Sequence, residues 1–138
     1  MTTARELMTQ GVECASVGDD LVTVAKKMRD LDVGALPICG DDQRLKGMIT
    51  DRDSVIKCVA EGKDPGSVKA SEFARGKPVT IGADDSAEET LKTMAKHQVR
   101  RLPVIDGHDL VGIVAQADVA RALDHETVGR VLAEVSED

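Results

Sequence analysis

The sequence predicts an α/β fold of the mixed (α+β) kind, made of two pseudo-symmetric β-α-β-β-α halves packed sheet to sheet. Short apolar runs bounded by Gly, Pro and Asp indicate strands, and apolar residues at helical spacing indicate helices between them. The same order of segments occurs twice within 138 residues. Each half alone would leave one face of its sheet uncovered. Two halves can bury these faces against each other, with a cleft on either side.

The second half repeats the first at a nearly constant offset. The offset is 66 residues from Pro37 to Pro103. After a one-residue deletion in a hairpin turn, it is 65 residues from Asp53 to Asp118. Matched positions at a steady spacing indicate an internal repeat, which dominates the prediction of the fold.

The boundary between the repeats is expected in the Gly- and Pro-containing stretch 61–66. The first repeat then covers residues 1–65. The second covers residues 66–138 and includes a C-terminal helical segment at 126–135, which is expected to pack across the first half or an oligomer partner.

In the first half, residues 4–8 form a helical lead-in and residues 12–17 a brief strand. A helix is expected over residues 21–31, because Asp20 can cap its free amides and apolar residues recur at helical spacing. Its buried face is expected to hold Leu21, Val24, Ala25, Met28 and Leu31.

Residues 34–53 organise this half. Two apolar runs, at 36–39 and 45–49, flank a Gly-Asp-Asp turn and predict a hairpin. A helix then begins at residues 50–53 and ends near residue 60. Its apolar positions are Val55, Ile56 and Val59.

The second half follows the same plan. A lead-in at 68–74, a short strand at 78–81 and a capping turn at 82–86 precede a helix. The core face of that helix is expected to hold Leu91, Met94 and Ala95. A second strand pair follows, and then a helix at 116–123.

Composition limits the possible functions. The formal charge of −7 argues against a general nucleic-acid binder, because phosphate contacts need clustered Lys and Arg. One Phe and no Trp or Tyr exclude an aromatic platform for stacking bases. No apolar run approaches the roughly 20 residues of a membrane span, and the N-terminus has no apolar signal core. A cytoplasmic protein without a membrane partner is expected.

Three cysteines, Cys14, Cys39 and Cys58, lie far apart and lack CxxC spacing. In a reducing compartment such cysteines are small buried apolar residues, which is the first interpretation. The alternative is a disulfide between Cys14 and Cys39, on strands expected to be neighbours. The spacing alone does not supply the Cα separation that a bridge requires.

Thr50 and Asp53 are the main candidates for a ligand site. Where a strand ends at a helix start, free backbone amides and the helix dipole favour an anion. The Thr50 hydroxyl can donate to a phosphate, and the Asp53 carboxylate can accept both hydroxyls of a ribose. Ala35, Leu36 and Ile38 can enclose a purine. Thr-x-x-Asp is also close to a capping box, which needs no ligand, and both interpretations stay open.

The second half keeps only part of this pattern. Asp118 retains the carboxylate, but Ala115 replaces the hydroxyl, so a second site is expected to be weaker or differently used. Arg100 and Arg101 occupy the positions equivalent to residues 34 and 35 and can pair with an anionic ligand. The alternative is that these arginines are solvated or paired with acidic side chains.

No catalytic or metal-binding set emerges from the sequence. The histidines, at positions 97, 108 and 125, lack metal-ligand spacing to one another or to the cysteines. A nucleophile, a base and an orienting group cannot be assembled. We therefore expect a protein that is not an enzyme and requires no cofactor.

Four segments resemble the tandem CBS-domain pair, or Bateman module, and the resemblance spans nearly the whole chain. They are GALPI at 34–38, GMITDRD at 47–53, HQVRRLPVI at 97–105 and GIVAQAD at 112–118. Within this family the chain is most similar to stand-alone pairs of the hypoxic-response-protein type.

The resemblance implies an adenine nucleotide (AMP, ADP or ATP) or a related adenosyl ligand in the cleft between the repeats. Thr50 would meet the phosphate or ribose end and Asp53 the ribose hydroxyls. Residues around Leu36 and Pro37 would meet the adenine, and Asp118 would be the ribose acid of a second site.

The resemblance also implies a homodimer formed through helices, for which Val55, Ile56 and Val59 offer an aliphatic surface. A stand-alone pair would be a regulatory sensor that signals to a separate protein partner. The alternative is a stress-response interaction protein with a vestigial nucleotide site. A third hypothesis, a nucleic-acid-associated regulator using Arg100 and Arg101, has the net charge against it.

Overall fold

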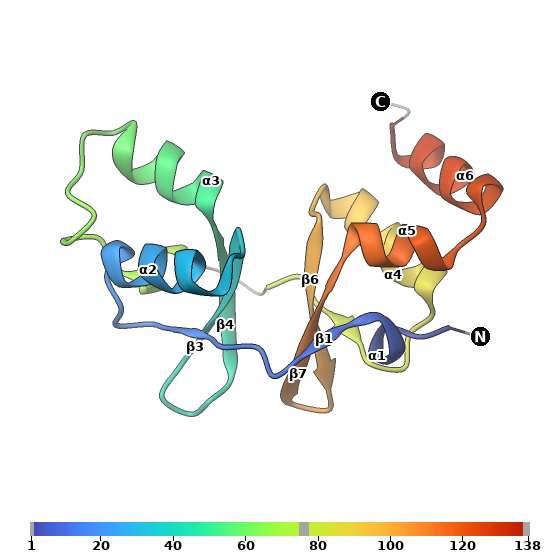
Figure 1. Cartoon of the computed structure of the whole chain (residues 1–138), viewed down its shortest axis with the longest axis horizontal. Helices are drawn as coiled ribbons and strands as arrows, with labels where there is room; N and C mark the ends of the chain where they lie inside the picture. The colour runs from blue at the N-terminus through green and yellow to red at the C-terminus, as the bar shows by residue number, and fades with distance from the viewer. Residues whose placement is uncertain (1, 75–77, 137–138) are drawn as a thin grey trace. The chain divides into compact units, whose positions relative to one another are not determined.

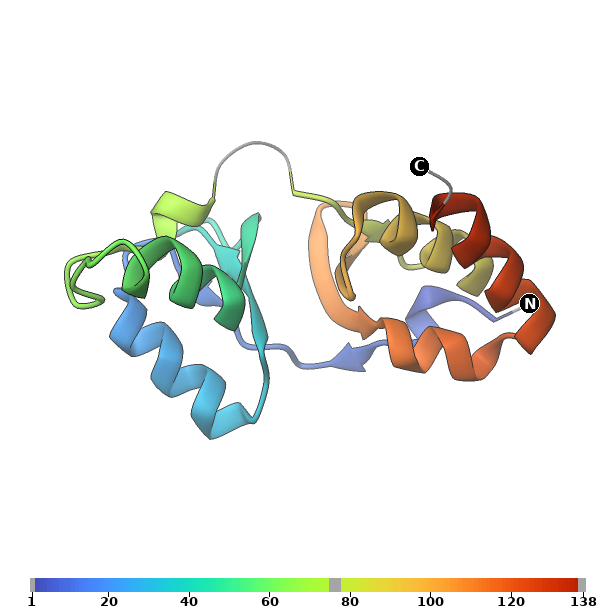
Figure 2. The same ribbon diagram turned by 90° about the horizontal axis from the view of Figure 1, so that it is seen from above.

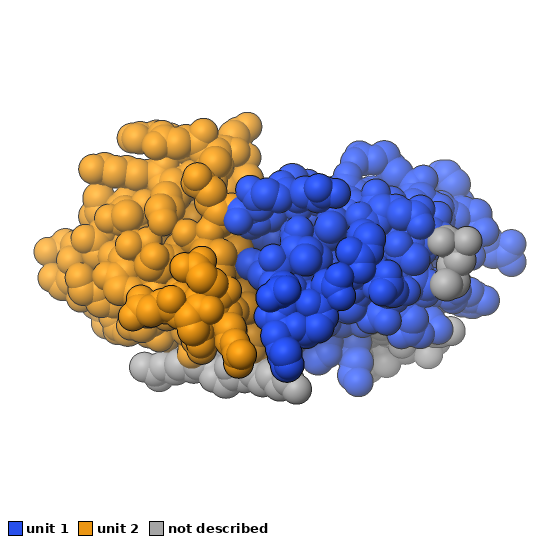
Figure 3. Space-filling view, turned by 90° about the horizontal axis from the view of Figure 1, so that it is seen from below, with its two compact units in different colours: residues 1–12, 79–138 blue, residues 13–78 orange. Residues whose placement is uncertain are grey.

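The computed structural model (Figure 1) describes residues 2–74 and 78–136. They form two compact units, coloured separately in Figure 3. Unit 1 comprises Met1–Val12 and Val79–Asp138, and unit 2 comprises Glu13–Pro78. The first residues of the chain thus pack with its second half. The repeat boundary at residues 65 and 66 therefore differs from the division into packed units and stays a prediction about the repeats.

Unit 2 contains a three-stranded sheet in the order β2-β3-β4. Its strands are β2 (Ala15–Ser16), β3 (Ala35–Cys39) and β4 (Leu45–Thr50). Strand β2 runs parallel to β3, and β3 pairs antiparallel with β4. The helical elements are α2 (Leu21–Leu31), α3 (Asp51–Ser54), the π-helix η1 (Val55–Val59) and the 3₁₀ helix η2 (Ala70–Phe73).

Unit 1 contains a four-stranded sheet in the order β1-β7-β6-β5. Its strands are β1 (Thr9–Gln10), β5 (Ile81–Gly82), β6 (Arg101–Asp106) and β7 (Asp109–Ala115). Its helices are α1 (Ala4–Leu7), α4 (Ala87–His97), α5 (Gln116–Ala122) and α6 (His125–Ser136).

The two units repeat one local geometry. Pro37 pairs with Met48, and Pro103 pairs with Ile113, so the prolines occupy the same place in each hairpin. Helices α2 and α4 each end at a residue in the left-handed region, Asp32 and Gln98, both with φ of 55°. The mixed α/β class is therefore confirmed. Packing of the repeats sheet to sheet stays a prediction.

Each unit has its own aliphatic core. In unit 2 the side chains of Leu36, Ile38 and Ile49 meet those of α2. In unit 1 a corresponding cluster joins Leu91 and Met94 of α4 to the sheet. With one aromatic residue in the chain, branched aliphatic side chains supply most of the volume in both cores.

Two predicted strands are wrong in extent. Residues 12–17 do not form one strand, because the chain passes here from unit 1 to unit 2. Strand β1 joins the sheet of unit 1 and β2 joins the sheet of unit 2. Gly11 between them has a φ of 67°, outside the extended region. The strand predicted at 78–81 is reduced to Ile81–Gly82.

The predicted buried face of α2 also needs correction. Leu21, Val24 and Met28 of α2 are buried, but Ala25 and Leu31 are exposed because the core of unit 2 covers only a narrow stripe of this helix. Helix α6 packs against α4 within unit 1, where Val131 is fully buried. Packing of α6 across the first half or an oligomer partner stays a prediction. Figure 2 shows α6 beside α4.

Helix α2 begins with a titratable cap. The backbone N–H of Thr23 donates to the Asp20 carboxylate at 2.8 Å and lowers the pKa of Asp20 below its ordinary value of 3.8. A depressed pKa in the folded state means that this stabilisation is present above pH 3.8 and is lost as the pH falls through the folded-state pKa.

We therefore expect Asp20→Ala to lower the melting temperature at neutral pH and to differ less from the wild type as the pH falls below 3.8. Asp20→Asn keeps an acceptor without a titrating group and is the control. Thermal unfolding followed by circular dichroism over this pH range measures the effect. A difference between wild type and Asp20→Ala that is independent of pH would contradict this assignment.

Candidate functional site

The hairpin of unit 2 places Thr50 opposite Ala35. These residues are partners in the β3–β4 register, and the N–H of Asp51 donates to the Gly34 carbonyl at 2.9 Å. Strand β4 therefore ends where α3 begins, with the hydroxyl of Thr50 beside the first residues of β3. The predicted association of Thr50, Asp53 and Ala35 follows from this register.

Thr50 and Asp53 form a capping box. The backbone N–H of Asp53 donates to Thr50 Oγ1 at 3.1 Å, and the N–H of Thr50 donates to Asp53 Oδ2 at 3.0 Å. The capping interpretation is therefore realised in the structure. The box leaves the hydroxyl hydrogen of Thr50 and the second carboxylate oxygen of Asp53 outside its two bonds.

Lys57 is a neighbour of Asp53 that the sequence analysis missed. Its Nζ lies 3.6 Å from Asp53 Oδ1 and 5.9 Å from the centroid of the Phe73 ring. The i, i+4 spacing of an acid and a lysine on one helix is the signal that would have found it. The Asp53 side chain is 28% exposed, so this polar end of β4 is accessible to solvent.

The apolar candidates lie on β3. Leu36 is 2% exposed and packs into the core of unit 2. Pro37 and Ala35 are also buried. Strand β2 pairs with β3 only at Ile38 and Cys39, so the remaining edge of β3 has no strand partner among the described residues.

In unit 1 the equivalent positions have different chemistry. Ala115 is the N-cap of α5 and provides no side-chain cap, and Asp118 pairs with Arg121. Arg101 is the partner of Ala115 in the β6–β7 register, and the Arg100 carbonyl accepts from the N–H of Gln116 at 2.8 Å. Both arginine side chains are exposed. The structure thus places the candidates in two groups, one in each unit.

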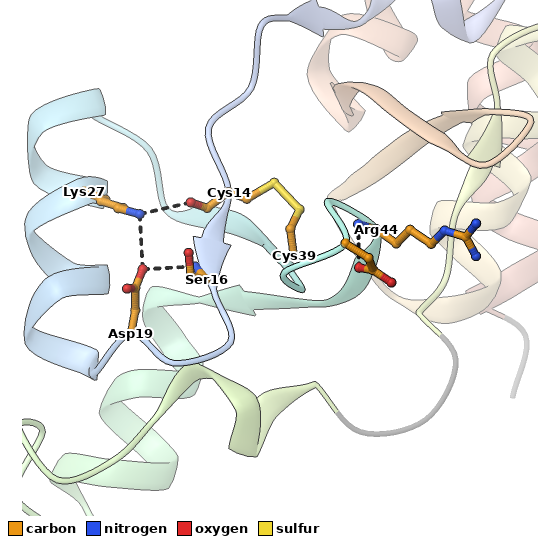
Figure 4. The surroundings of a disulfide bond; sticks show 7 residues. Cys14, Ser16, Asp19, Lys27, Cys39 and Arg44 are labelled. Carbon is orange, nitrogen blue, oxygen red and sulfur yellow. Dashed lines mark hydrogen bonds and ion pairs between the residues drawn. A yellow bond between two sulfur atoms is a disulfide. The ribbon is translucent and has the colours of Figure 1, made fainter.

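A disulfide joins Cys14 to Cys39 in unit 2, with Cα atoms 5.7 Å apart (Figure 4). The alternative interpretation, a disulfide between Cys14 and Cys39, is the one found in the structure, and the first interpretation, three free buried cysteines, is wrong for this pair. Lys27 Nζ donates to the Cys14 carbonyl and to Asp19 Oδ2, each at 3.1 Å, and the Ser16 N–H donates to the same Asp19 oxygen. The disulfide and these bonds hold the chain where it enters unit 2. Cys58 is a buried free thiol.

The described residues contain no group of three or more His, Cys, Asp or Glu side chains arranged to hold a metal ion. Cys14 and Cys39, joined to each other, do not supply thiolate ligands. In the same part of the chain, no helix is long and apolar enough to cross a membrane.

The CBS-domain family matches this chain at residues 4–53 and 70–125, and these ranges contain both hairpins and both helix starts described above. The chain belongs to the CBS-domain family. It carries two copies of the CBS domain and is therefore a CBS pair.

The CBS pair has relatives of similar length. It is 52% identical to Hypoxic response protein 1 of Mycobacterium tuberculosis over 128 aligned residues. The alignment covers 93% of this chain and 90% of that protein. A crystal structure of Hypoxic Response Protein I with two coordinated zinc ions matches with a TM-score of 0.80 and 54% identity, over 89% of this chain and all of that one. The residues described in either unit of this CBS pair do not offer a fitting zinc site.

Two solved structures share the fold at lower identity. The CBS pair of MJ0100, in complex with 5′-methylthioadenosine and S-adenosyl-L-methionine, matches with a TM-score of 0.78 at 24% identity, over 88% of this chain and 95% of that one. CBSX2 in complex with AMP matches with a TM-score of 0.74 at 19% identity, over 88% of this chain and 96% of that one.

We expect Thr50→Ala to destabilise unit 2 by about 1 kcal/mol, because an N-cap hydroxyl is lost. Thr50→Ser retains the hydroxyl and should be nearly neutral. Urea unfolding followed by circular dichroism gives both values. Equal stability of wild type and Thr50→Ala would show that the cap contributes nothing to the fold.

Reduction of the disulfide is expected to lower stability by about 3 kcal/mol, because cross-linking two residues 25 positions apart restricts the unfolded chain. Thermal unfolding with and without dithiothreitol measures the change, and a Cys14→Ser/Cys39→Ser variant should not respond to the reductant. After denaturation without reductant, a thiol assay should find Cys58 alone. Three reactive thiols would contradict the pairing and favour a reducing compartment.

Proposed function

We propose that this CBS pair is a non-catalytic regulatory protein that binds an adenine nucleotide and signals to a separate protein partner. The observation that carries the proposal is the partly buried, solvent-accessible polar end of β4. There, Thr50 and Asp53 retain unused hydrogen-bonding capacity at the junction of β4 and α3, where Thr50 lies opposite Ala35 of β3.

The capping box is compatible with ligand binding. Thr50 Oγ1 accepts one bond in the cap and can still donate its hydrogen to a ribose or phosphate oxygen. Asp53 uses Oδ2 in the cap, and within the described part of the chain Oδ1 has only the longer contact with Lys57. A ribose hydroxyl that donates to Oδ1 would form a charge-assisted hydrogen bond.

The choice of an adenine nucleotide also draws on related structures. The MJ0100 pair is complexed with adenosyl compounds and CBSX2 with AMP. In this chain, Ala35 and the Leu36–Pro37 edge of β3 are proposed to meet the adenine. We propose that the site lies in the cleft between the two repeats.

A second site in unit 1 is proposed to be weaker. Asp118 is paired with Arg121, and Ala115 provides no hydroxyl. Arg100 and Arg101 are exposed and can pair with the phosphates of an anionic ligand.

The regulatory part of the proposal includes a homodimer in the cytoplasm and a role in a stress response. The alternative function is an interaction protein whose nucleotide site is vestigial. The capping box favours this alternative, because the box accounts for both Thr50 and Asp53 without a ligand.

The first test is the near-ultraviolet spectrum of the purified protein, since a chain without Trp or Tyr absorbs little in the adenine band. Calorimetric titration with AMP, ADP, ATP and adenosine follows. We expect Asp53→Asn to weaken binding by about tenfold or more, because the charged acceptor of the ribose is lost while the cap keeps an acceptor.

The control for this titration is Asp30→Asn, which makes the same change of charge on the exposed side of α2. It should bind like the wild type. If none of the four compounds binds or shifts the melting temperature, the vestigial-site alternative replaces the proposal. If Asp53→Asn binds as tightly as the wild type, the ligand lies elsewhere.

A further inference from the structure

Ser71 of unit 2 occupies the place that Arg5 has in unit 1. In unit 1 the backbone N–H of Arg5 donates to the Ala83 carbonyl at 2.9 Å. In unit 2 the N–H of Ser71 donates to the Val17 carbonyl at 2.9 Å. The preceding residue of each segment makes a second matched bond, at 2.9 Å in unit 1 and 2.7 Å in unit 2. Donors and acceptors are all related by the repeat offset of 66 residues, so the two side chains start from equivalent backbone positions.

In unit 1 the Arg5 guanidinium joins two turns. Its Nη2 donates to Asp106 Oδ2 at 3.0 Å and to Asp84 Oδ1 at 3.4 Å. Asp84 lies in the turn before α4, and Asp106 is the last residue of β6, where the hairpin turns. One arginine thus pairs with two carboxylates, an arrangement that suits the planar fork of a guanidinium.

Unit 2 lacks all three of these side chains. The repeat offset carries Arg5 to Ser71, Asp84 to Gly18 and Asp106 to Gly40. The space at Gly18 is open, because beyond its chain neighbours none of the described heavy atoms lies within 4 Å of the position of a Cβ there. The guanidinium and both of its acceptors are therefore missing from one and the same place.

A pocket of about 520 Å³ lies at this place in unit 2. Two of its lining residues, Ser71 and Gly40, are the counterparts of Arg5 and Asp106, so the pocket occupies the position of the ion pair in unit 1. It lies at the turn of the β3–β4 hairpin, whereas Thr50 is at the other end of β4. The lining also includes Val17, Asp41, Asp42 and Lys46.

The pocket still carries an uncommitted carboxylate. Asp42 is occupied, since Oδ1 accepts from the Arg44 N–H at 3.0 Å and Oδ2 from Lys46 Nζ at 3.2 Å. Asp41 has no hydrogen bond or ion pair to any residue that the structure describes. The Lys46 stem crosses Gly40, where a Cβ would lie 2.6 Å from Lys46 Cε. Lys46 thus takes the space of a side chain at position 40, and the available carboxylate stands at position 41 instead.

We infer that this pocket binds a guanidinium group that comes from outside the chain. The Asp41 carboxylate and the Ser71 hydroxyl both accept hydrogen bonds, and a guanidinium offers five N–H donors. Because Lys46 is neutralised by Asp42, the charge left in the pocket is the negative charge of Asp41. The group belongs either to a free guanidino compound or to an arginine side chain of a protein partner. This site is separate from the proposed nucleotide site and does not depend on it.

The direct test is an NMR titration of the full chain with agmatine and with an Ala-Arg-Ala peptide blocked at both ends. Chemical shifts of residues 16–18, 40–46 and 71 should change, with a Kd on the order of 1 mM because the ion pair is partly exposed. The same peptide with citrulline in place of arginine has the shape without the charge and should bind about tenfold more weakly or less. Tighter binding of agmatine identifies a small molecule as the source, and tighter binding of the arginine peptide identifies a protein side chain.

Ser71→Arg should rebuild the unit 1 arrangement. The new side chain fills the pocket from the position equivalent to Arg5 and can pair with Asp41, so it should abolish agmatine binding and raise the melting temperature. Asp41→Asn should weaken agmatine binding by about tenfold, and in this background Ser71→Arg should no longer stabilise. Asp30→Asn, the same change on the exposed side of α2, should bind agmatine like the wild type.

The inference fails if neither guanidino probe changes these chemical shifts, an outcome that leaves the nucleotide proposal untouched. It also fails if the citrulline peptide binds as tightly as the arginine peptide, or if agmatine binding survives both Asp41→Asn and Ser71→Arg. The comparison of arginine with citrulline uses the wild-type chain, so it decides the question even where a variant does not fold.

Discussion

The structure depends on the register of its two antiparallel hairpins. Pairing Pro37 with Met48 brings Thr50 opposite Ala35, and the backbone bond from Asp51 to Gly34 then begins α3 at the end of the strand. The second hairpin repeats these contacts with Arg101, Ala115 and Gln116. Because a shift of one residue would turn the apolar side chains out of the core, the hairpin register also determines the position of every candidate ligand residue.

The sequence predicts those parts of the fold that local patterns determine. Helix α2 occupies the predicted residues 21–31, because its cap and its apolar spacing agree. Strand β1 is different. The sequence around Thr9 and Gln10 has no strand pattern, and these residues form a strand because they pair with β7 of unit 1. The membership of residues 1–12 in unit 1 is likewise a long-range effect. Such contacts leave no periodicity in the sequence.

The sequence predicts which residues form the candidate site, but it does not predict whether they bind a ligand or only cap the helix. Thr50 and Asp53 were identified from their spacing, and the structure brings them together. The same two side chains serve the cap and the proposed ligand, with Asp53 Oδ2 used in the cap and Oδ1 proposed for the ribose, so the geometry is compatible with both functions. Lys57 was missed because a lysine at i+4 from an acid is common on helices, and its approach to Phe73 depends on the fold of residues 70–73.

The differences between the repeats leave both the cap hydroxyl and the exposed apolar helical face in unit 2. Unit 2 keeps the cap hydroxyl of Thr50 and an apolar helical face, whereas unit 1 has Ala115 and a face covered by α6. The proposed ligand site and the exposed apolar side chains of η1 lie on one helical segment, since α3 begins at the cap and continues directly into η1. Only about one helical turn separates Asp53 from Ile56. In the proposed homodimer, a ligand that displaces or tightens the start of α3 would also act on η1, whose apolar side chains the resemblance places at the contact between copies, so binding and association would be physically coupled.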